Sequence, residues 1–148
     1  MHSKRIGSII LNLSVLLMSR KREHGERNFE LSELLHEGKK YYDWVVTTCF
    51  YAAIHFVEDV LLPCEINGSS CKTISDVKSA YKMQGRHSAR ERLVCEKMDL
   101  QTAVKYKWLD DKSRYSRYTT YKVTPTEADK AREYTRQIQN RCYDVNQT

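Results

Sequence analysis

One long apolar segment dominates the pattern of hydrophobic and polar positions along the chain. Residues 41–62, YYDWVVTTCFYAAIHFVEDVLL, contain neither Gly nor Pro, and Pro63 follows them directly. In a helix of this sequence, apolar side chains fall on nearly every face, which is typical of a helix buried by several neighbours. The segment therefore predicts the central helix of a helical bundle.

Shorter helical patterns flank this segment. Before it, residues 28–39 place Leu31, Leu34 and Leu35 on one side of a helix. After it, the pattern predicts helices over residues 75–82, 88–98, 100–118 and from 124 to near the end of the chain. The loop at residues 63–72 carries a turn signal, and only residues 118–123 have strand character. The predicted fold class is all-α, a single up-and-down bundle of about five helices.

Two of these helices carry capping-box signals at their starts. In the first, Ser88 is the expected cap with Glu91 three residues on. In the second, Thr124 is the expected cap, Pro125 suits the first helical position, and Glu127 completes the box. Within this last helix a core-facing seam recurs at spacings of three and four: Ala128, Ala131, Thr135, Ile138 and Cys142.

The composition suits one compact helical domain. The chain has 148 residues, of which 41% are hydrophobic, with five Gly and two Pro. We expect residues 1–27 to be a basic N-terminal extension, with Met18 as an alternative start, and residues 28–148 to be the helical domain. The apolar residues 6–18 are too few to span a bilayer, so we expect a cytoplasmic protein without a membrane segment. Export is the alternative, with residues 6–18 as a signal and Cys64 bridged to Cys71.

Neither a metal nor a cofactor is expected. The five Cys form no C-x-x-C pair, which argues against a zinc site or a disulfide framework. The sequence also has no Gly-rich phosphate loop, no His-Glu-x-x-His and no nucleophile elbow. Chemistry in this chain would have to come from its own acid–base side chains.

Positive charge is concentrated in residues 86–122. The chain has a formal net charge of +6, and this segment holds ten Lys/Arg against five Asp/Glu. Such a segment is compatible with binding phosphate or nucleic acid, and the alternative is a solvated surface.

Arg86, His87 and Arg90 lie around a predicted helix start, where free N–H groups and the helix dipole favour an anion. A surface helix start with ion pairs to Glu91 is the alternative.

Basic and aromatic residues alternate at the end of the same segment. Arg114, Arg117, Tyr118 and Tyr121 fall on one helical face if the helix continues that far. This combination suits single-stranded nucleic acid, through contacts to the backbone and stacking on bases. The alternative is that the arginines make structural contacts and that the Tyr118 hydroxyl is a buried anchor.

One ionisable ring, His55, lies within the apolar central segment. Tyr51 precedes it by one helical turn and Asp59 follows by one turn, so the three share a face. Asp59 could orient the imidazole as carboxylates orient catalytic histidines. The alternative is a core histidine with its hydrogen bonds satisfied.

The order of these motifs resembles the HEPN superfamily of small helical bundles, over about residues 29–143. The resemblance rests on four stretches in sequence: Tyr51-Ala52-Ala53-Ile54-His55, His87-x-x-Arg90, the run LDDKSRYSRY at 109–118, and Thr124-Pro125-Thr126-Glu127-Ala128. It implies a four- or five-helix bundle that usually forms a homodimer. Many members are metal-independent ribonucleases of toxin–antitoxin, CRISPR or antiviral defence systems, and others bind RNA or nucleotides or act as interaction modules.

The chain departs from the ribonuclease motif of that superfamily, an Arg followed by four to six residues and a His. No His here has an Arg at that spacing. The basic segment at residues 86–122 leads us to expect RNA or a nucleotide as ligand. The resemblance also implies a homodimer and an antitoxin-type protein as partners. If the protein cleaves RNA, His87 or His55 would transfer the proton, and Arg90, Arg114 and Arg117 would stabilise charge on the phosphate. A non-catalytic homodimeric protein–protein interaction module is the alternative.

Overall fold

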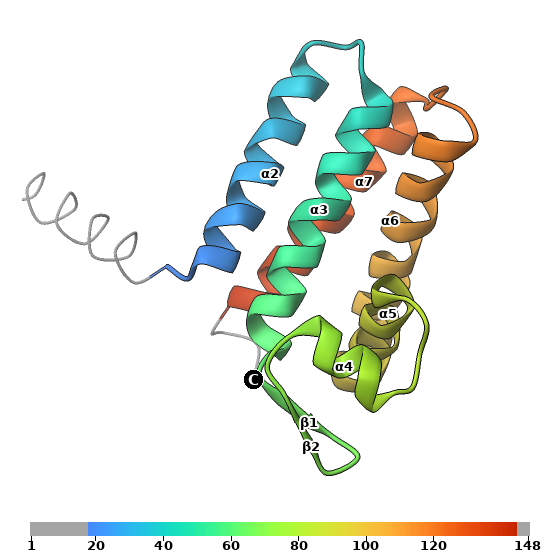
Figure 1. Ribbon diagram of the computed structural model, residues 1–148. Helices are drawn as coiled ribbons and strands as arrows, with labels where there is room; N and C mark the ends of the chain where they lie inside the picture. The colour runs from blue at the N-terminus through green and yellow to red at the C-terminus, as the bar shows by residue number, and fades with distance from the viewer. Residues whose placement is uncertain (1–17, 145–148) are drawn as a thin grey trace, which may run out of the picture.

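Helix α3 (Tyr42–Leu61) runs through the middle of the structure, as the apolar segment predicts (Figure 1). The computed structural model describes residues 18–144, which fold into six helices and a two-stranded sheet. Three long helices pack against α3: α2 (Arg20–Glu37), α6 (Leu100–Tyr118) and α7 (Pro125–Tyr143). The all-α bundle predicted from the sequence is confirmed. The length and composition of α3 would also suit a membrane span, but most of it is buried inside this bundle.

Helix α2 begins at Arg20, so it includes residues that the sequence assigned to an N-terminal extension. The Ser19 hydroxyl caps it by accepting a hydrogen bond from the Arg22 amide. Gly25 packs so closely on the Phe56 ring that a Cβ at residue 25 would overlap the ring. Because the contact uses a glycine, this part of α2 lacks the apolar periodicity that marks a core-facing helix. Residues 1–17, with nearly all of the segment that the export alternative treats as a signal, lie outside the described residues.

The apolar side predicted for α2 is only partly buried. Leu35 packs on the main core, but the Leu31 and Leu34 side chains are 45% and 60% exposed. Of the three leucines that share one side of the predicted helix, only Leu35 thus contributes to the core. The residues of α2 that fit against α3 are small ones, Gly25 and Ser32, both buried.

A hairpin follows α3 where the sequence predicted only a loop. Strands β1 (Cys64–Ile66) and β2 (Ser69–Cys71) pair antiparallel. Asn67 and Gly68 between them have positive φ angles of 50° and 77°, as a two-residue type I′ turn requires. Cys64 lies opposite Cys71 in the register, and both are free thiols. In contrast, residues 119–123, part of the stretch with strand character, contain no strand.

Helices α4 (Ile74–Ala80) and α5 (Arg86–Lys97) enclose a second, smaller core with the hairpin. Helix α5 begins at Arg86, with extended Gly85 as its N-cap and no side-chain cap. The predicted cap at Ser88 is therefore wrong. The Ala89 amide already donates to the Gly85 carbonyl at 3.1 Å, so Ser88 lies inside the first turn.

Helices α6 and α7 match their prediction. Thr124 accepts from the Glu127 amide, the Glu127 carboxylate accepts from the Thr124 amide, and Pro125 is the first helical residue. The predicted seam of α7 faces the core, with Ala128, Ala131, Thr135 and Ile138 fully buried and Cys142 partly buried.

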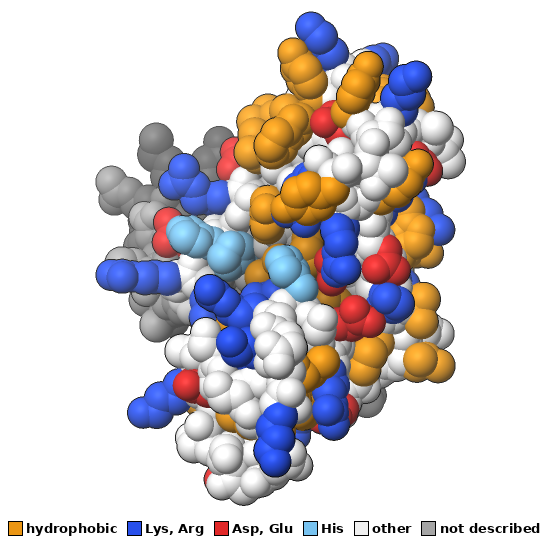
Figure 2. All heavy atoms as spheres, turned by 45° about the vertical axis from the view of Figure 1, so that its right-hand side comes forward, with side chains coloured by type: hydrophobic (Ala, Val, Ile, Leu, Met, Phe, Trp, Pro, Cys, Tyr) orange, Lys and Arg blue, Asp and Glu red, His pale blue; other side chains and the backbone are white. Residues whose placement is uncertain are grey.

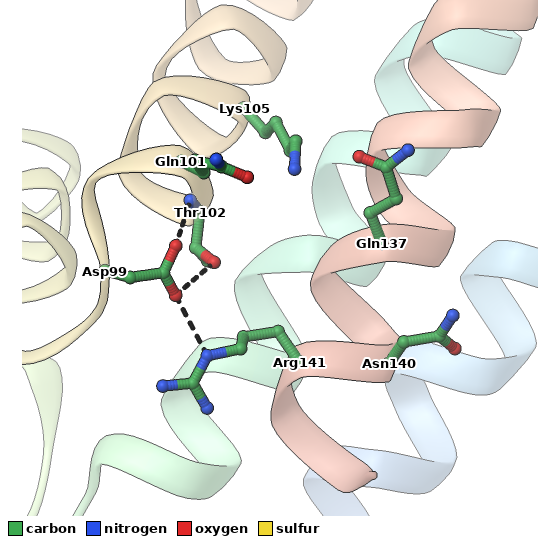
Figure 3. Close-up of a pocket in the computed structure, with 7 residues that line it drawn as sticks. All are labelled: Asp99, Gln101, Thr102, Lys105, Gln137, Asn140 and Arg141. Carbon is green, nitrogen blue, oxygen red and sulfur yellow. Dashed lines mark hydrogen bonds and ion pairs between the residues drawn. The ribbon is translucent and has the colours of Figure 1, made fainter. Parts of the chain in front are cut away.

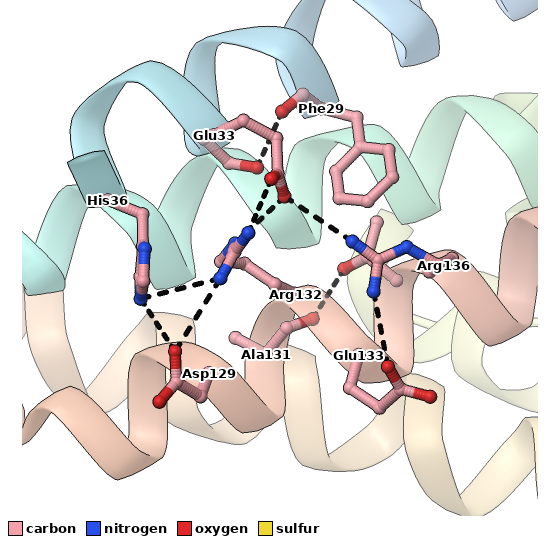
Figure 4. A network of polar contacts seen from close by, with 10 residues as sticks. Phe29, Glu33, His36, Asp129, Ala131, Arg132, Glu133 and Arg136 are labelled. Atoms are coloured by element: carbon pink, nitrogen blue, oxygen red, sulfur yellow. Dashed lines mark hydrogen bonds and ion pairs between the residues drawn. The ribbon is translucent and has the colours of Figure 1, made fainter.

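A network of hydrogen bonds and ion pairs joins α7 to α2 (Figure 4). The Arg132 guanidinium donates two hydrogen bonds to the Glu33 carboxylate, which lowers the pKa of Glu33. His36 lies 2.6 Å from Asp129, and Arg136 also approaches Glu33. These contacts fix the outer helices around α3, so that side chains on different helices keep their relative positions.

Candidate functional site

His87 lies in the first turn of α5 and is exposed to solvent. Its ring stacks on Phe50, a fully buried residue of α3, with the centroids 5.9 Å apart and an interplanar angle of 26°. The imidazole therefore has one face on the core and the rest open to solvent. Arg86, the first residue of α5, is exposed beside it in sequence and has no ion pair within residues 18–144.

Partial burial lowers the pKa of His87 below its ordinary value of 6.5. The positive charges of Arg90, Arg114 and Arg117 act in the same direction, and the carboxylate of Asp110 opposes them. The imidazole is therefore neutral near pH 7. A neutral imidazole can accept a proton, which is what a general base must do.

Two arginines of α6 provide positive charge near this ring. Arg114 donates to Asp110 at 3.0 Å, and half of its side chain stays exposed. Arg117 donates from Nη1 to the Tyr51 hydroxyl at 3.0 Å and from Nε to the Ser113 carbonyl at 3.2 Å. Both guanidinium groups are held in place from one side, which leaves donors free for an anion.

Arg90 forms an ion pair inside the protein. Its side chain is buried, and Nε and Nη2 both lie 2.7 Å from Oε1 of Glu58 on α3. The guanidinium is thus committed to a carboxylate that ties α5 to α3. The geometry favours a structural role for Arg90 over the predicted contact with a phosphate.

Three polar atoms of α6 lie buried on the side of the helix that contains Asp110. The Tyr106 hydroxyl, the Asp110 Oδ2 atom and the Ser113 hydroxyl have no hydrogen-bond partner among residues 18–144. Their spacing of four and three residues places them on one face of α6. Buried polar atoms normally have partners. The Oδ2 atom of Asp110 can therefore accept a further hydrogen bond. The same carboxylate acts to raise the pKa of His87.

The sequence groups Tyr51, His55 and Asp59 on one face of α3, and in the structure each contacts a residue of another helix. Tyr51 accepts from Arg117 of α6. Asp59 does not orient His55, because its carboxylate accepts from Ser19 at 2.5 Å and from Tyr143 at 2.9 Å. The ring of His55 instead packs edge-on against His24 of α2, with centroids 5.1 Å apart. Burial and the charge of His24 lower the pKa of His55.

His24 is a residue that sequence reasoning missed. It lies in the charged stretch before the predicted start of the first helix, where no apolar pattern indicated a helical face. Its exposed imidazole becomes a neighbour of His55 only because α2 begins early and packs on α3.

These side chains form one surface, which we call the histidine face: His24, His55, His87, Arg114 and Arg117. Figure 2 shows histidine side chains in a row across one side of the molecule, with Lys and Arg on both sides of the row. The face is built from α2, α3, α5 and α6. Tyr118 and Tyr121, also predicted to contact RNA, lie beyond it at the end of α6, with side chains 77% and 73% exposed. The predicted burial of Tyr118 as a structural anchor is excluded.

Apart from the histidine face, a polar hollow lies between the start of α6 and the end of α7 (Figure 3). Its volume is about 330 Å³. Asp99 caps α6 by accepting from the Thr102 amide, and it also accepts from Arg141; these bonds lower the pKa of Asp99 to about 2. The ion pair between Asp99 and Arg141 joins α6 to α7. Within residues 18–144, no group of three His, Cys, Asp or Glu side chains could hold a metal ion.

Comparison with known proteins gives a family and nothing finer. The family model described as "HEPN domain" matches residues 18–145. No curated protein and no solved structure matches the chain. The match begins before Arg20, where α2 starts, and ends after Tyr143, where α7 ends, so it covers all the helices described above. The chain therefore belongs to the HEPN domain family.

Proposed function

We propose that this HEPN domain binds single-stranded RNA, or another phosphate-bearing ligand, on the histidine face. The observation that carries the proposal is that three solvent-accessible imidazoles lie on the same face as two guanidinium groups held by their own helix. Phosphate oxygens would accept hydrogen bonds from Arg114 and Arg117, and Arg suits this geometry because its donors are planar and paired.

The same face has the groups that RNA cleavage without a metal would need. In that reaction the 2′-hydroxyl attacks the adjacent phosphorus, the bond from phosphorus to the 5′-oxygen breaks, and a 2′,3′-cyclic phosphate remains. Neutral His87 would accept the 2′-hydroxyl proton, and Arg114 and Arg117 would stabilise the charge on the phosphate. The leaving 5′-oxygen takes up a proton from water. His55 also has a lowered pKa that keeps it neutral near pH 7, so it is the alternative base.

The experiment is incubation of labelled single-stranded RNA with the protein in EDTA, at several salt concentrations. We expect binding that weakens as salt increases, and cleavage that His87→Ala abolishes. His36→Ala is the matched control, because His36 lies in the network between α2 and α7 and should leave both activities unchanged. Binding without cleavage would make the domain an RNA-binding module. Absence of binding at low salt would overturn the proposal.

Two exposed leucines support a homodimer as part of the proposal. Leu31 and Leu34 lie on the solvent side of α2, and Leu31 lies two turns after His24 on the same side. Exposed apolar patches on small proteins often mark contacts with another protein. A dimer formed through these leucines would bring the histidine faces of two copies near each other. A non-catalytic homodimeric interaction module remains the second candidate function.

A further inference from the structure

The turn between α2 and α3 and the connection from α6 to α7 lie at the same end of the bundle (Figure 1). Four aromatic side chains are largely exposed there. The exposed fractions are 49% for Tyr41, 53% for Trp44, 77% for Tyr118 and 73% for Tyr121. We call these four residues the aromatic end. The other tryptophan, Trp108, packs edge-on against Tyr134 at 5.4 Å as part of the core. The four side chains of the aromatic end, by contrast, belong to neither core cluster.

Two adjoining hollows lie among these side chains. The larger, of about 640 Å³, lies between residues 40–44 and residues 121–124, and the smaller, of about 510 Å³, lies between α3 and residues 116–121. Trp44 and Tyr121 line both hollows. Volumes of about 300–1,000 Å³ are typical of sites for small molecules. A planar ring could therefore enter beside Trp44 and Tyr121 from either side.

Positive side chains surround the same hollows. Lys40 and Lys122 line the larger one, and neither forms an ion pair within the described part of the chain. Arg117 lines the smaller one, with its guanidinium 5.3 Å from the centre of the Tyr118 ring. Aromatic faces combined with unpaired cations are what single-stranded nucleic acid requires, because bases stack on the rings and phosphates pair with the cations.

Asp43 is the one carboxylate that lines both hollows. Its side chain has no hydrogen bond or ion pair among residues 18–144. A carboxylate would repel a phosphate at this point, but it can accept hydrogen bonds from the amino group of a base. The arrangement thus places bases near Asp43, Trp44 and Tyr121, and phosphates near the outer cations.

We propose that the aromatic end is a base-stacking subsite for single-stranded nucleic acid. The proposal rests on the proposed function, because Arg117 joins the two surfaces: it donates to Tyr51 of α3 and also lies against Tyr118. A strand whose phosphates contact Arg114 and Arg117 on the histidine face would continue past Tyr118. Its next bases would stack on Trp44 and Tyr121.

The test compares two strands of equal length, a short oligodeoxyadenylate and the same strand without bases. Deoxy strands lack the 2′-hydroxyl, so binding is measured without cleavage. We expect oligodeoxyadenylate to quench the fluorescence of exposed Trp44. Tyr121→Ala should weaken its binding about tenfold and leave binding of the abasic strand unchanged, since stacking on one aromatic ring contributes to affinity by roughly that factor.

Matched variants separate stacking from other effects. Tyr121→Phe keeps the ring and should bind like the wild type. Tyr115→Ala removes another exposed tyrosine of α6 that lines neither hollow, and it should also bind like the wild type. Thermal unfolding of each variant establishes that it is folded.

Each contrary result has a distinct meaning. If Tyr121→Ala binds oligodeoxyadenylate as tightly as the wild type while Arg114→Ala weakens binding of both strands, the stacking proposal fails and the histidine face remains. If the wild type binds neither strand, the stacking proposal fails, and the experiment with labelled RNA decides the proposed function separately. If Tyr121→Ala changes only the mass of the protein in sedimentation, the aromatic end binds another protein chain, and the stacking proposal is overturned.

Discussion

His55 and His87, two of the three imidazoles of the histidine face, are kept neutral for the same physical reason. Burial disfavours the charged form of His55 and of His87, and neighbouring positive charge adds to the effect. A lowered pKa also links these residues to stability. The unfolded chain binds more protons than the folded protein at pH values between the folded and unfolded pKa.

We predict that both imidazoles titrate below pH 6.5 in the folded protein, the ordinary value from which their pKa is lowered. Their contribution to the free energy of unfolding is complete above pH 6.5 and is lost as the pH falls through the folded pKa values. NMR titration of the ring protons measures the first effect, and denaturant unfolding at a series of pH values measures the second. A midpoint above 6.5 for either ring would contradict the prediction.

A second prediction concerns the charge that acts on His87 from within α6. The Asp110 carboxylate raises the pKa of His87 against the stronger lowering effects, so Asp110→Asn should lower that pKa further. NMR titration of His87 is the measurement. Asp111→Asn, which removes the neighbouring exposed carboxylate, is the control and should leave the midpoint in place. Equal shifts in the two variants would mean that Asp110 has no specific effect on this ring.

The ion pair between Arg90 and Glu58 leads to a third prediction. Because both side chains are largely buried, Glu58→Gln leaves the Arg90 guanidinium without a counter-charge. We expect the free energy of unfolding to fall by about 3 kcal/mol. The exposed pair of Lys107 and Asp111 is the comparison, since breaking it with Asp111→Asn should cost at most about 1 kcal/mol. Denaturant unfolding measures both, and a similar small loss in each would contradict a structural role for Arg90.

At the scale of single helices, the two capping signals provide a matched pair. Thr124→Ala removes the hydroxyl that accepts from the Glu127 amide, so the protein should lose about 1 kcal/mol of stability. Ser88 lies inside the first turn of α5 and caps nothing, so Ser88→Ala should be close to neutral. Thermal unfolding compares the two variants. A loss with Ser88→Ala as large as with Thr124→Ala would mean that α5 begins later than Arg86.

These two helices also show what local sequence can determine. The signals at Thr124 and at Ser88 are alike in the sequence, but the N-cap of α5 is Gly85, three residues before Ser88. Long helices with strong apolar patterns, α3, α6 and α7, could be predicted to within a residue or so at the ends that the sequence marks. The strands of the hairpin have three residues each, too few for an alternating pattern to be recognised, although the turn at Asn67-Gly68 was correctly located.

The candidate site was harder to predict because its side chains come from four helices. The sequence identified His55, His87, Arg114 and Arg117 as separate motifs, and the structure places them on one face. It could not identify Glu58 as the partner of Arg90, or His24 as the neighbour of His55, because such contacts depend on how α2, α3 and α5 pack. Asp59 was chosen for His55 by spacing along one helix, but its carboxylate accepts from Ser19, the N-cap of α2, and from Tyr143 of α7.

At the scale of the whole molecule, α3 supports both proposed binding surfaces. Its middle carries Phe50, Tyr51 and His55 beneath or within the histidine face, and its first turn carries Trp44 of the aromatic end. The outer helices are fixed around it by the network between α2 and α7. A third exposed surface is the solvent side of α2. Leu31 and Leu34 are exposed there, beside two hollows that share Arg27 and Leu31.

The last prediction follows from that surface. Leu31→Glu combined with Leu34→Glu places charge on an exposed apolar patch, so folding should be unaffected while a dimer formed through α2 dissociates. Sedimentation analysis should give a dimer for the wild type and a monomer for this variant. Leu100→Glu is the control, because Leu100 is 79% exposed at the start of α6, away from α2. If the monomeric variant still binds RNA but no longer cleaves it, the reaction needs histidine faces from two copies. A wild type that is already monomeric would contradict the dimer through α2.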